Sequence, residues 1–479
     1  MRSVMAALIV ILALAVPSAQ QGSTRMVLKG KAPVSSDILK VKLPRPQVAD
    51  LTNGLHVMVL EDRRLPQIAF TIIIPGAGGY FDPAAKIGLA SYTASLMREG
   101  TKTRTSAKIS ETLETMAATL AVSSSLSGPN ATVSGSALTE NFDKLMDLTA
   151  DVLLNPAFLP EEWDRFKTRT KAGLVQQRTN PSFLATEMLN RVIFGTHPAG
   201  RVSPTVENVD AITPDALAEF HRTHYVPDHA AIAFSGDISL AEARKLLESK
   251  LGAWKKGTAP RPAVGDPEAI GPAKVYLIAR PGSVQTTLFV GTQSMRRTDP
   301  DYAALTVANR VLGGVMGRLF RHLREEKGYT YGIGSRFTAT DYRGSWLSST
   351  NVRTDVTEPA LRDLLAEIAE LRETAVPENE LADAKRAIVG SFALELEDPQ
   401  QVLNYYVDSW LYGLPADYWD TYPARVTAVT AAQAQAAAKK YWATDRLQIV
   451  AVGDATKVAD ILRKQGTLEL YDAEGRPMK

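Results

Sequence analysis

The chain has 479 residues, of which 45% are hydrophobic and 22% are charged, as in ordinary globular proteins. This length exceeds what one hydrophobic core usually organises, so we expect two or more domains. The 54 basic and 52 acidic residues leave a net charge of +2, which gives no reason to expect binding to nucleic acid or to a membrane surface. The chain contains no cysteine, which excludes disulfides and a cysteine-linked lipid anchor.

The first residues have the composition of an export signal. Arg2 is followed by an uninterrupted apolar run from Val4 to Val16 and then by Pro17-Ser18-Ala19, which is the order of regions in a secretory signal peptide. The run is shorter than the roughly 18 apolar residues of a membrane-spanning helix. We therefore expect residues 1–19 to be a signal peptide, and the mature protein to be soluble and periplasmic.

Strands and helices are expected in separate blocks. The predicted strands are rich in β-branched residues, and the predicted helices repeat apolar residues at a spacing of three and four. The strands are expected at 55–60, 68–74, 230–234 and 447–452, and two of the helices at 141–154 and 361–373. Because strands and helices do not alternate strictly, the fold class is predicted to be α+β, with helices packed on a mostly antiparallel sheet.

The second half of the chain repeats landmarks of the first half in nearly constant register. Pro160 corresponds to Pro377 (377 − 160 = 217), and Asn180-Pro181 corresponds to Asp398-Pro399 (399 − 181 = 218). Two further matched pairs share the offset of 217: Thr213 with Thr430, and Asp237 with Asp454. A period this long indicates two copies of a whole domain. We predict homologous domains at 40–254 and 273–475, joined by a linker rich in Pro and Gly at 255–272.

A predicted helix in the first half has the surroundings of a known motif but not its metal-binding residues. Residues 88–101 read Gly-Leu-Ala-Ser-Tyr-Thr-Ala-Ser-Leu-Met-Arg-Glu-Gly-Thr. They resemble the H-x-x-E-H helix of pitrilysin/insulinase-type (inverzincin) zinc peptidases, in which two histidines bind zinc and the glutamate acts on water. Ser91, Ala94 and Ser95 occupy those three positions. Neither serine nor alanine offers an imidazole for zinc, and Ala94 cannot accept a proton.

The resemblance implies a third zinc ligand, a glutamate on a later helix. The corresponding region, 170–178, contains Gln176 and Gln177 and no acidic residue. A neutral amide is a poor zinc ligand, so no metal is expected in this chain. The helix is then interpreted as a packing element, with Ala90, Ala94 and Met97 among the residues that face a core.

A second signature lies at 312–331, where a Gly-Gly turn precedes a helix and the sequence Arg324-Glu-Glu-Lys-Gly-Tyr-Thr-Tyr331. It resembles the family's arginine and tyrosine, seven residues apart, which hold the substrate carbonyl and stabilise the tetrahedral oxyanion. A fixed cation and a phenolic donor suit that role. The alternative is that Arg324 contacts the last carbonyls of its helix and Tyr331 packs within a strand.

Two further groups of residues are weaker candidates. His221, His224 and His229 form H-x2-H-x4-H, but they lie where a helix ends and a strand begins, so their rings are expected to diverge. The segment Gly76-Ala77-Gly78-Gly79 is interpreted as a flexible connection and not as a phosphate-binding loop.

Near the second signature, three residues have no match to the family pattern. They are interpreted as a solvated helix face and comprise Arg318, Arg321 and His322.

Together, the resemblance implies the non-catalytic subunit of a heterodimeric, periplasmic zinc peptidase. Arg324 and Tyr331 would act in an active site whose zinc is held by a homologous partner chain with an intact H-x-x-E-H, and the substrate would be a peptide. Two alternatives remain open. The chain could be a structural or peptide-binding scaffold, or an independent hydrolase that uses Ser91 or Ser95, although neither serine has a recognisable base beside it.

Overall fold

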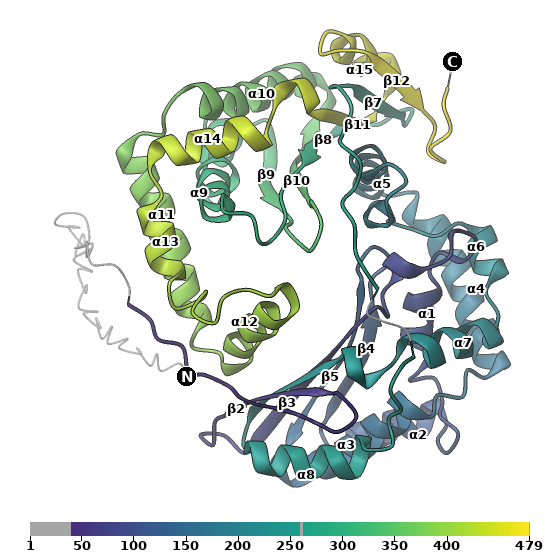
Figure 1. Ribbon diagram of the computed structural model, residues 1–479. Helices are drawn as coiled ribbons and strands as arrows, with labels where there is room; N and C mark the ends of the chain where they lie inside the picture. Colours follow the sequence, from purple (N-terminus) through teal and green to yellow (C-terminus); the bar gives the residue numbers. More distant parts are fainter. Residues whose placement is uncertain (1–39, 259–261, 479) are drawn as a thin grey trace, which may run out of the picture. The chain divides into compact units, whose positions relative to one another are not determined.

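The computed structural model describes residues 40–258 and 262–478, and Figure 1 shows their helices and strands. The predicted signal peptide at 1–19 lies outside these residues. Within them, no helix is both long enough and apolar enough to cross a bilayer.

The first sheet is built from six strands in the order β1-β2-β6-β3-β5-β4. All of its strand pairs are antiparallel except β2 with β6. The strands are β1 (Gln47–Asp50), β2 (His56–Glu61), β3 (Gln67–Pro75), β4 (Thr119–Ser124), β5 (Asn130–Leu138) and β6 (Ala231–Gly236).

The second sheet also has six strands, in the order β12-β7-β11-β8-β10-β9. Here β11 and β12 both pair with β7 in parallel, and the other pairs are antiparallel. The strands are β7 (Val275–Ala279), β8 (Gln285–Gln293), β9 (Thr330–Phe337), β10 (Ser345–Arg353), β11 (Gln448–Gly453) and β12 (Leu468–Tyr471). Two mostly antiparallel sheets with attached helices confirm the duplicated α+β fold.

Helices fill the intervals between the strands in the same sequence in both halves. The first half contains α1 (Leu89–Leu96), α2 (Ser106–Thr115), α3 (Thr139–Leu154), α4 (Pro160–Gln177), α5 (Pro181–Phe194), α6 (Val206–Ala211), α7 (Pro214–His224) and α8 (Leu240–Leu251). The second half contains α9 (Tyr302–Gly313), the π-helix η5 (Phe320–Glu326), α10 (Thr357–Glu373), α11 (Glu378–Glu395), α12 (Pro399–Tyr412), α13 (Tyr422–Ala428), α14 (Ala431–Tyr441) and α15 (Ala455–Arg463). In element order α1 thus corresponds to α9, α2 to η5 and β4 to β9.

Most of the repeated landmarks of the sequence lie at helix starts, although Asp237 does not. The Asn180 side chain accepts the backbone N–H of Ser182 at the start of α5, and Asp398 accepts that of Gln400 at the start of α12. Both helices have proline in the first turn, where its missing N–H costs nothing. The two copies therefore preserve the residues that satisfy free backbone groups.

Two helices pack on the sheet of the opposite half. Apolar residues of α5 form a buried cluster with residues of β7, β8 and β11. Gly291 in β8 is required there, because a Cβ would lie 2.9 Å from Leu189 Cδ2. In turn α12 contacts β6, where the Ser235 hydroxyl donates to Gln400 Oε1 at 2.8 Å. The two halves are therefore joined by reciprocal packing, which their separate sequence patterns do not reveal.

The segment Gly76–Gly79 is tightly bonded, so its interpretation as a flexible connection is wrong. The N–H groups of Gly76 and Gly78 donate to the Pro129 carbonyl, at 2.8 and 3.2 Å. A Cβ on Gly78 would lie 2.1 Å from the Gly128 oxygen. The glycines serve a close approach of two backbones.

Candidate functional site

The start of α1 is held by a buried carboxylate. Asp82 is 4% exposed, and its oxygens accept the backbone N–H groups of Gly88 at 2.7 Å and Ala90 at 2.9 Å. Burial raises the pKa of Asp82 to about 6, although these two hydrogen bonds oppose the shift. Gly88 has a φ of 101°, which favours glycine. Sequence analysis missed Asp82, whose only signal is an acidic residue six positions before the glycine.

The three positions of the degenerate motif lie on this helix without any metal-binding group. Ala94 is fully buried at 0% exposure, and Ser91 and Ser95 are half-buried. The Ser95 hydroxyl donates to the Ser91 carbonyl at 2.9 Å, one turn back along the helix. This bond, typical of serine within helices, directs the hydroxyl to the backbone and not to a catalytic base. The geometry gives no support to a hydrolase that uses Ser95.

The two glutamines lie at the C-terminal end of α4. Gln177 is half-buried and donates from its amide to the Ser203 hydroxyl at 2.6 Å, whereas Gln176 is exposed. Across residues 40–258 and 262–478, no group of three or more His, Cys, Asp or Glu side chains could hold a metal ion. The residues present do not fit zinc.

Two of the three histidines of the H-x2-H-x4-H pattern bond to different backbone carbonyls. A ring nitrogen of His221 lies 2.8 Å from the Leu153 carbonyl, and one of His224 lies 2.7 Å from the Gly76 carbonyl. Burial lowers the pKa of both rings. Each ring therefore serves as a neutral structural donor to a different backbone oxygen.

Arg324 and Tyr331 are brought together in the second half. The guanidinium carbon of Arg324 lies 5.0 Å from the centroid of the Tyr331 ring and 4.5 Å from that of Phe320. Tyr331 is 89% exposed at the start of β9, the edge strand of its sheet. The alternative in which Tyr331 packs within a strand is therefore wrong, because its ring is exposed and lies against the half-buried Arg324 and not against a core. A cation stacked on an aromatic face is held in place by both charge and contact.

The helix that carries Arg324 is wider than an α-helix. In η5 the N–H of Lys327 donates to the carbonyl of His322, five residues earlier, at 3.1 Å. Such π-helical turns are rare and occur often at functional sites. The change of pitch turns Arg324 relative to an ideal α-helix, which the sequence pattern does not predict.

A glycine-rich loop leads into this helix and exposes two apolar side chains. Val315 is 75% exposed and Met316 is 53% exposed, in the turn between Gly313 and Gly317. Met316 has a φ of 63°, in the left-handed region that residues other than glycine rarely adopt.

The solvated face predicted on the same helix is a network of ion pairs. Arg318 is 7% exposed and its guanidinium lies 2.7 Å from Glu380 of α11. Arg321 also pairs with Glu380, and His322 Nδ1 lies 2.8 Å from Glu367 of α10. The prediction is wrong for Arg318, whose acidic partner lies 62 residues away in sequence, whereas the Arg321 side chain is 43% exposed.

Two family profiles match consecutive parts of the chain. The profile described as Insulinase (Peptidase family M16) matches residues 57–203, and that described as Peptidase M16 inactive domain matches residues 211–388. An uncharacterized zinc protease of Streptomyces coelicolor is 27% identical over 302 residues, which are 61% of this chain and 65% of that protein. The chain thus matches just under two thirds of that relative's length.

A further relative is described as lacking peptidase activity. The non-peptidase homolog YmxG of Helicobacter pylori is 25% identical over 369 residues, covering 76% of this chain and 84% of that protein.

Solved structures agree with these matches. The peptidase M16 inactive domain from Pseudomonas fluorescens superposes with a TM-score of 0.80 at 28% identity, covering 86% of this chain and 98% of that one. A protease from Helicobacter pylori superposes with a TM-score of 0.79 at 15% identity, covering 86% of this chain and 100% of that one, and so shares the fold. Since both halves match and the duplicated fold is shared, the chain belongs to the insulinase-type peptidase family M16.

Proposed function

We propose that this chain is the non-catalytic subunit of a two-chain zinc peptidase. The observation that carries the proposal is a division within the chain: Arg324 and Tyr331 lie together on an exposed edge, while the motif positions hold Ser91, Ala94 and Ser95. A cation and phenol of this kind can stabilise an oxyanion only where something generates one. The oxyanion would be generated in the active site of a homologous partner chain with an intact H-x-x-E-H.

The chemistry of this chain is then electrostatic. Arg324 would hold the carbonyl oxygen of a peptide substrate, and the Tyr331 hydroxyl would donate a hydrogen bond that strengthens as negative charge develops on that oxygen. Zinc in the partner would supply the activated water. No proton is transferred by this chain's own residues.

The exposed loop beside the pair suits a contact with the partner. Val315 and Met316 extend into solvent next to the helix that carries Arg324. Burying these side chains would remove apolar surface from water, which favours a complex. A partner covering this loop would also exclude water from the pair and strengthen its electrostatic effect.

The cellular location forms part of the proposal. The arrangement of Arg2, the apolar run and Pro17-Ser18-Ala19 supports export to the periplasm. The partner would need an export signal too, because both subunits must reach the same compartment.

Co-expression with an H-x-x-E-H chain of similar size tests the proposal. We expect a complex on size-exclusion chromatography, zinc in the complex after dialysis, and peptidase activity that neither chain shows alone. One tightly held zinc per chain with activity in the absence of any partner would overturn it.

The second candidate is a structural or peptide-binding scaffold, favoured by the description of the Helicobacter pylori relative as a non-peptidase homolog. Under this alternative the chain binds peptide or partner with no gain of hydrolysis. The same co-expression experiment separates the two, because only the subunit proposal requires activity to appear with the complex.

A further inference from the structure

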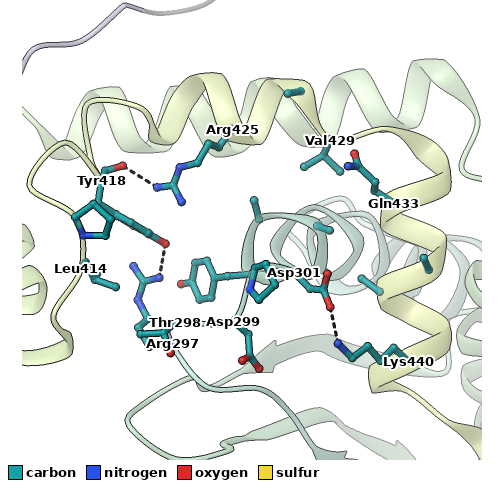
Figure 2. A pocket seen from close by; sticks show the side chains of 18 of the residues that line it. Arg297, Thr298, Asp299, Asp301, Leu414, Tyr418, Arg425, Val429, Gln433 and Lys440 are labelled. Atoms are coloured by element: carbon teal, nitrogen blue, oxygen red, sulfur yellow. Dashed lines mark hydrogen bonds and ion pairs between the residues drawn. The ribbon is translucent and has the colours of Figure 1, made fainter.

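A cavity in the second half lies apart from both family motifs. It has a volume of about 680 Å³ and is bounded by residues 297–304, the loop 413–418, the end of α13 and the face of α14 (Figure 2). Neither Arg324 nor Tyr331 lines it. Pockets for small organic molecules have volumes of about 300–1,000 Å³.

Two arginines meet at one tyrosine of this cavity. The guanidinium carbons of Arg297 and Arg425 lie 4.8 and 3.7 Å from the centroid of the Tyr418 ring. Arg297 donates to the Tyr418 hydroxyl, and Arg425 donates to the Tyr418 carbonyl at 2.7 Å. Figure 2 shows both guanidinium groups directed toward Tyr418. Arg297 is only 5% exposed, and its charge also lies 4.0 Å from the Tyr302 centroid.

Neighbouring acids are engaged elsewhere. Asp301 lies 2.7 Å from the ammonium of Lys440, and Asp299 accepts the backbone N–H of Arg296 at 3.1 Å. Asp408 interacts electrostatically with Arg297 but forms no ion pair with it, and burial raises the pKa of Asp408.

The two positive charges are therefore left without a direct acidic partner. Among the described ion pairs, none joins Arg297 or Arg425 to a carboxylate. The Nε of Arg425 is also buried without a hydrogen-bond partner. Buried positive charge without a counter-ion is costly, so an anion entering the cavity would be favoured.

The helix N-terminus at this cavity can be compared with the N-terminus of α1 in the first half. There, Asp82 supplies a carboxylate to the N-terminus of α1 at 2.7 Å from the N–H of Gly88. Its counterpart α9 begins after Asp301, whose carboxylate makes no capping hydrogen bond and pairs with Lys440 instead, and Ala303 and Ala304 of the first turn line the cavity. The N-terminus of this 12-residue helix adds positive electrostatic potential to that of the two arginines.

The rest of the wall is apolar and selects the remainder of the ligand. It is formed by Leu414, Pro415, Ala428, Val429, Ala436 and Ala437. This surface favours an aliphatic or aromatic body over a fully hydrated anion such as phosphate. The Gln433 side-chain oxygen caps α14 by accepting the Thr430 N–H, and its amide N–H groups can donate to a neighbouring peptide group.

We propose that this cavity binds an organic carboxylate with an apolar body, such as the C-terminal end of a short peptide. Arg297 and Arg425 would hold the carboxylate, and the apolar wall would take the adjoining side chain. The site is independent of the proposed subunit function, because it uses neither the Arg324–Tyr331 pair nor a partner chain.

Isothermal titration of the full chain with four probes tests the ligand class. The probes are acetyl-Ala-Ala-Leu with a free carboxylate, the same peptide as its C-terminal amide, 4-methylpentanoate and inorganic phosphate. We expect the peptide acid to bind at least tenfold more tightly than its amide, since the amide lacks the charge that the arginines pair. Comparable binding of 4-methylpentanoate would identify a free acid as the source, and weaker binding would identify a peptide.

Substitutions locate the binding site. Arg425→Gln should weaken binding of the peptide acid at least tenfold. The affinity of Arg425→Lys should lie between those of wild type and Arg425→Gln, because lysine keeps the charge but lacks the planar fork. Ala436→Trp, at an exposed position of α14, should block the cavity while leaving both arginines in place. Arg463→Gln, which removes an exposed arginine paired with Asp460, is the matched control and should change nothing.

Three results would overturn the proposal. They are no heat from the peptide acid at millimolar concentration, equal affinities for the acid and its amide, and phosphate binding as tight as that of the acid. Should Arg425→Gln fail to fold, unchanged affinity in Ala436→Trp would be equally decisive against it.

Discussion

The two halves of the chain repeat one order of elements but differ where the family places its chemistry. In the first half, α1 is a regular helix whose motif position Ala94 is fully buried. In the second half, the segment from α9 to β9 contains a π-helix, a strained Met316 and an exposed Tyr331. In the first copy the helix serves packing, whereas the second copy has an exposed tyrosine beside a π-helix. The first half also has a non-glycine residue with a positive φ between the corresponding elements, Ala117 at 49°, so the difference lies in the π-helix and the exposed Tyr331.

The largest effect is expected from the second half. Tyr331→Phe or Arg324→Ala should lower the turnover of the reconstituted pair by roughly 10²–10³, the usual cost of losing one oxyanion donor. The phenylalanine keeps the ring that stacks on Arg324, so assembly should persist. Steady-state kinetics of the complex give the measurement, with zinc content and elution volume recorded beside them.

Arg336→Ala is the matched control, because Arg336 is exposed on the same strand. It should leave turnover unchanged. A rise in the Michaelis constant at constant turnover in Tyr331→Phe would assign the tyrosine to substrate binding alone.

In the first half, reintroducing a residue of the active motif should destabilise the fold. Ala94→Glu introduces the residue type of the active motif, but the position has 0% exposure, so the new carboxylate would be buried. We expect a loss of about 3 kcal/mol or more in the free energy of unfolding, the cost of burying an unpaired charge. Urea unfolding followed by circular dichroism measures it.

The control on the same helix is Ser91→Glu, at a half-buried position in the first turn, where negative charge suits the helix N-terminus. Its unfolding free energy should change little. Equal stability of Ala94→Glu and wild type would mean that the helix still accommodates the ancestral side chain.

Much of the fold could be predicted because its signals are local. The β-branched runs at 55–60 and 68–74 became β2 and β3, and the helices at 141–154 and 361–373 became α3 and α10, with ends shifted by at most four residues. The duplication was visible in part because two of its landmark pairs, Asn180 with Asp398 and Thr213 with Thr430, are helix caps, which each copy needs for its own backbone. The predicted domain boundaries and linker stay predictions.

What the sequence could not predict depends on distant partners. The motif positions and the Arg324–Tyr331 spacing are readable as a pattern, but the stacking of that pair depends on the π-helical turn. The burial of Arg318 depends on Glu380, 62 residues away. Likewise the cavity around Tyr418 joins residues from 297 to 440, and no local pattern marks it. The catalytic role of the pair stays a prediction.

The buried carboxylate of the first half should make stability depend on pH. The pKa of Asp82 is about 6 in the folded state against 3.8 ordinarily, a difference worth roughly 3 kcal/mol at most. Because the folded value is raised, the stabilising contribution is fully present below pH about 4 and is lost as pH rises to about 6. Asp82→Asn cannot titrate, so its unfolding free energy minus that of wild type should increase over this window. A difference that stays constant with pH would show that the two backbone N–H groups keep the carboxylate ionised.

The smallest effects test whether the two copies are still equivalent at their helix starts. Asn180→Ala and Asp398→Ala each remove a side chain that accepts a backbone N–H two residues ahead, and each should cost about 1 kcal/mol. Asn180→Ser and Asp398→Ser keep a capping oxygen and should lose only a few tenths of that. Because α5 and α12 pack on opposite sheets, either alanine variant loosens a contact between the halves as well as its own helix. Thermal unfolding of the double alanine variant should then show a loss larger than the sum of the single losses, since each helix supports the sheet against which the other half is built. If the two single losses simply add, α5 and α12 are stabilised independently. Their similar caps would then not couple the two halves.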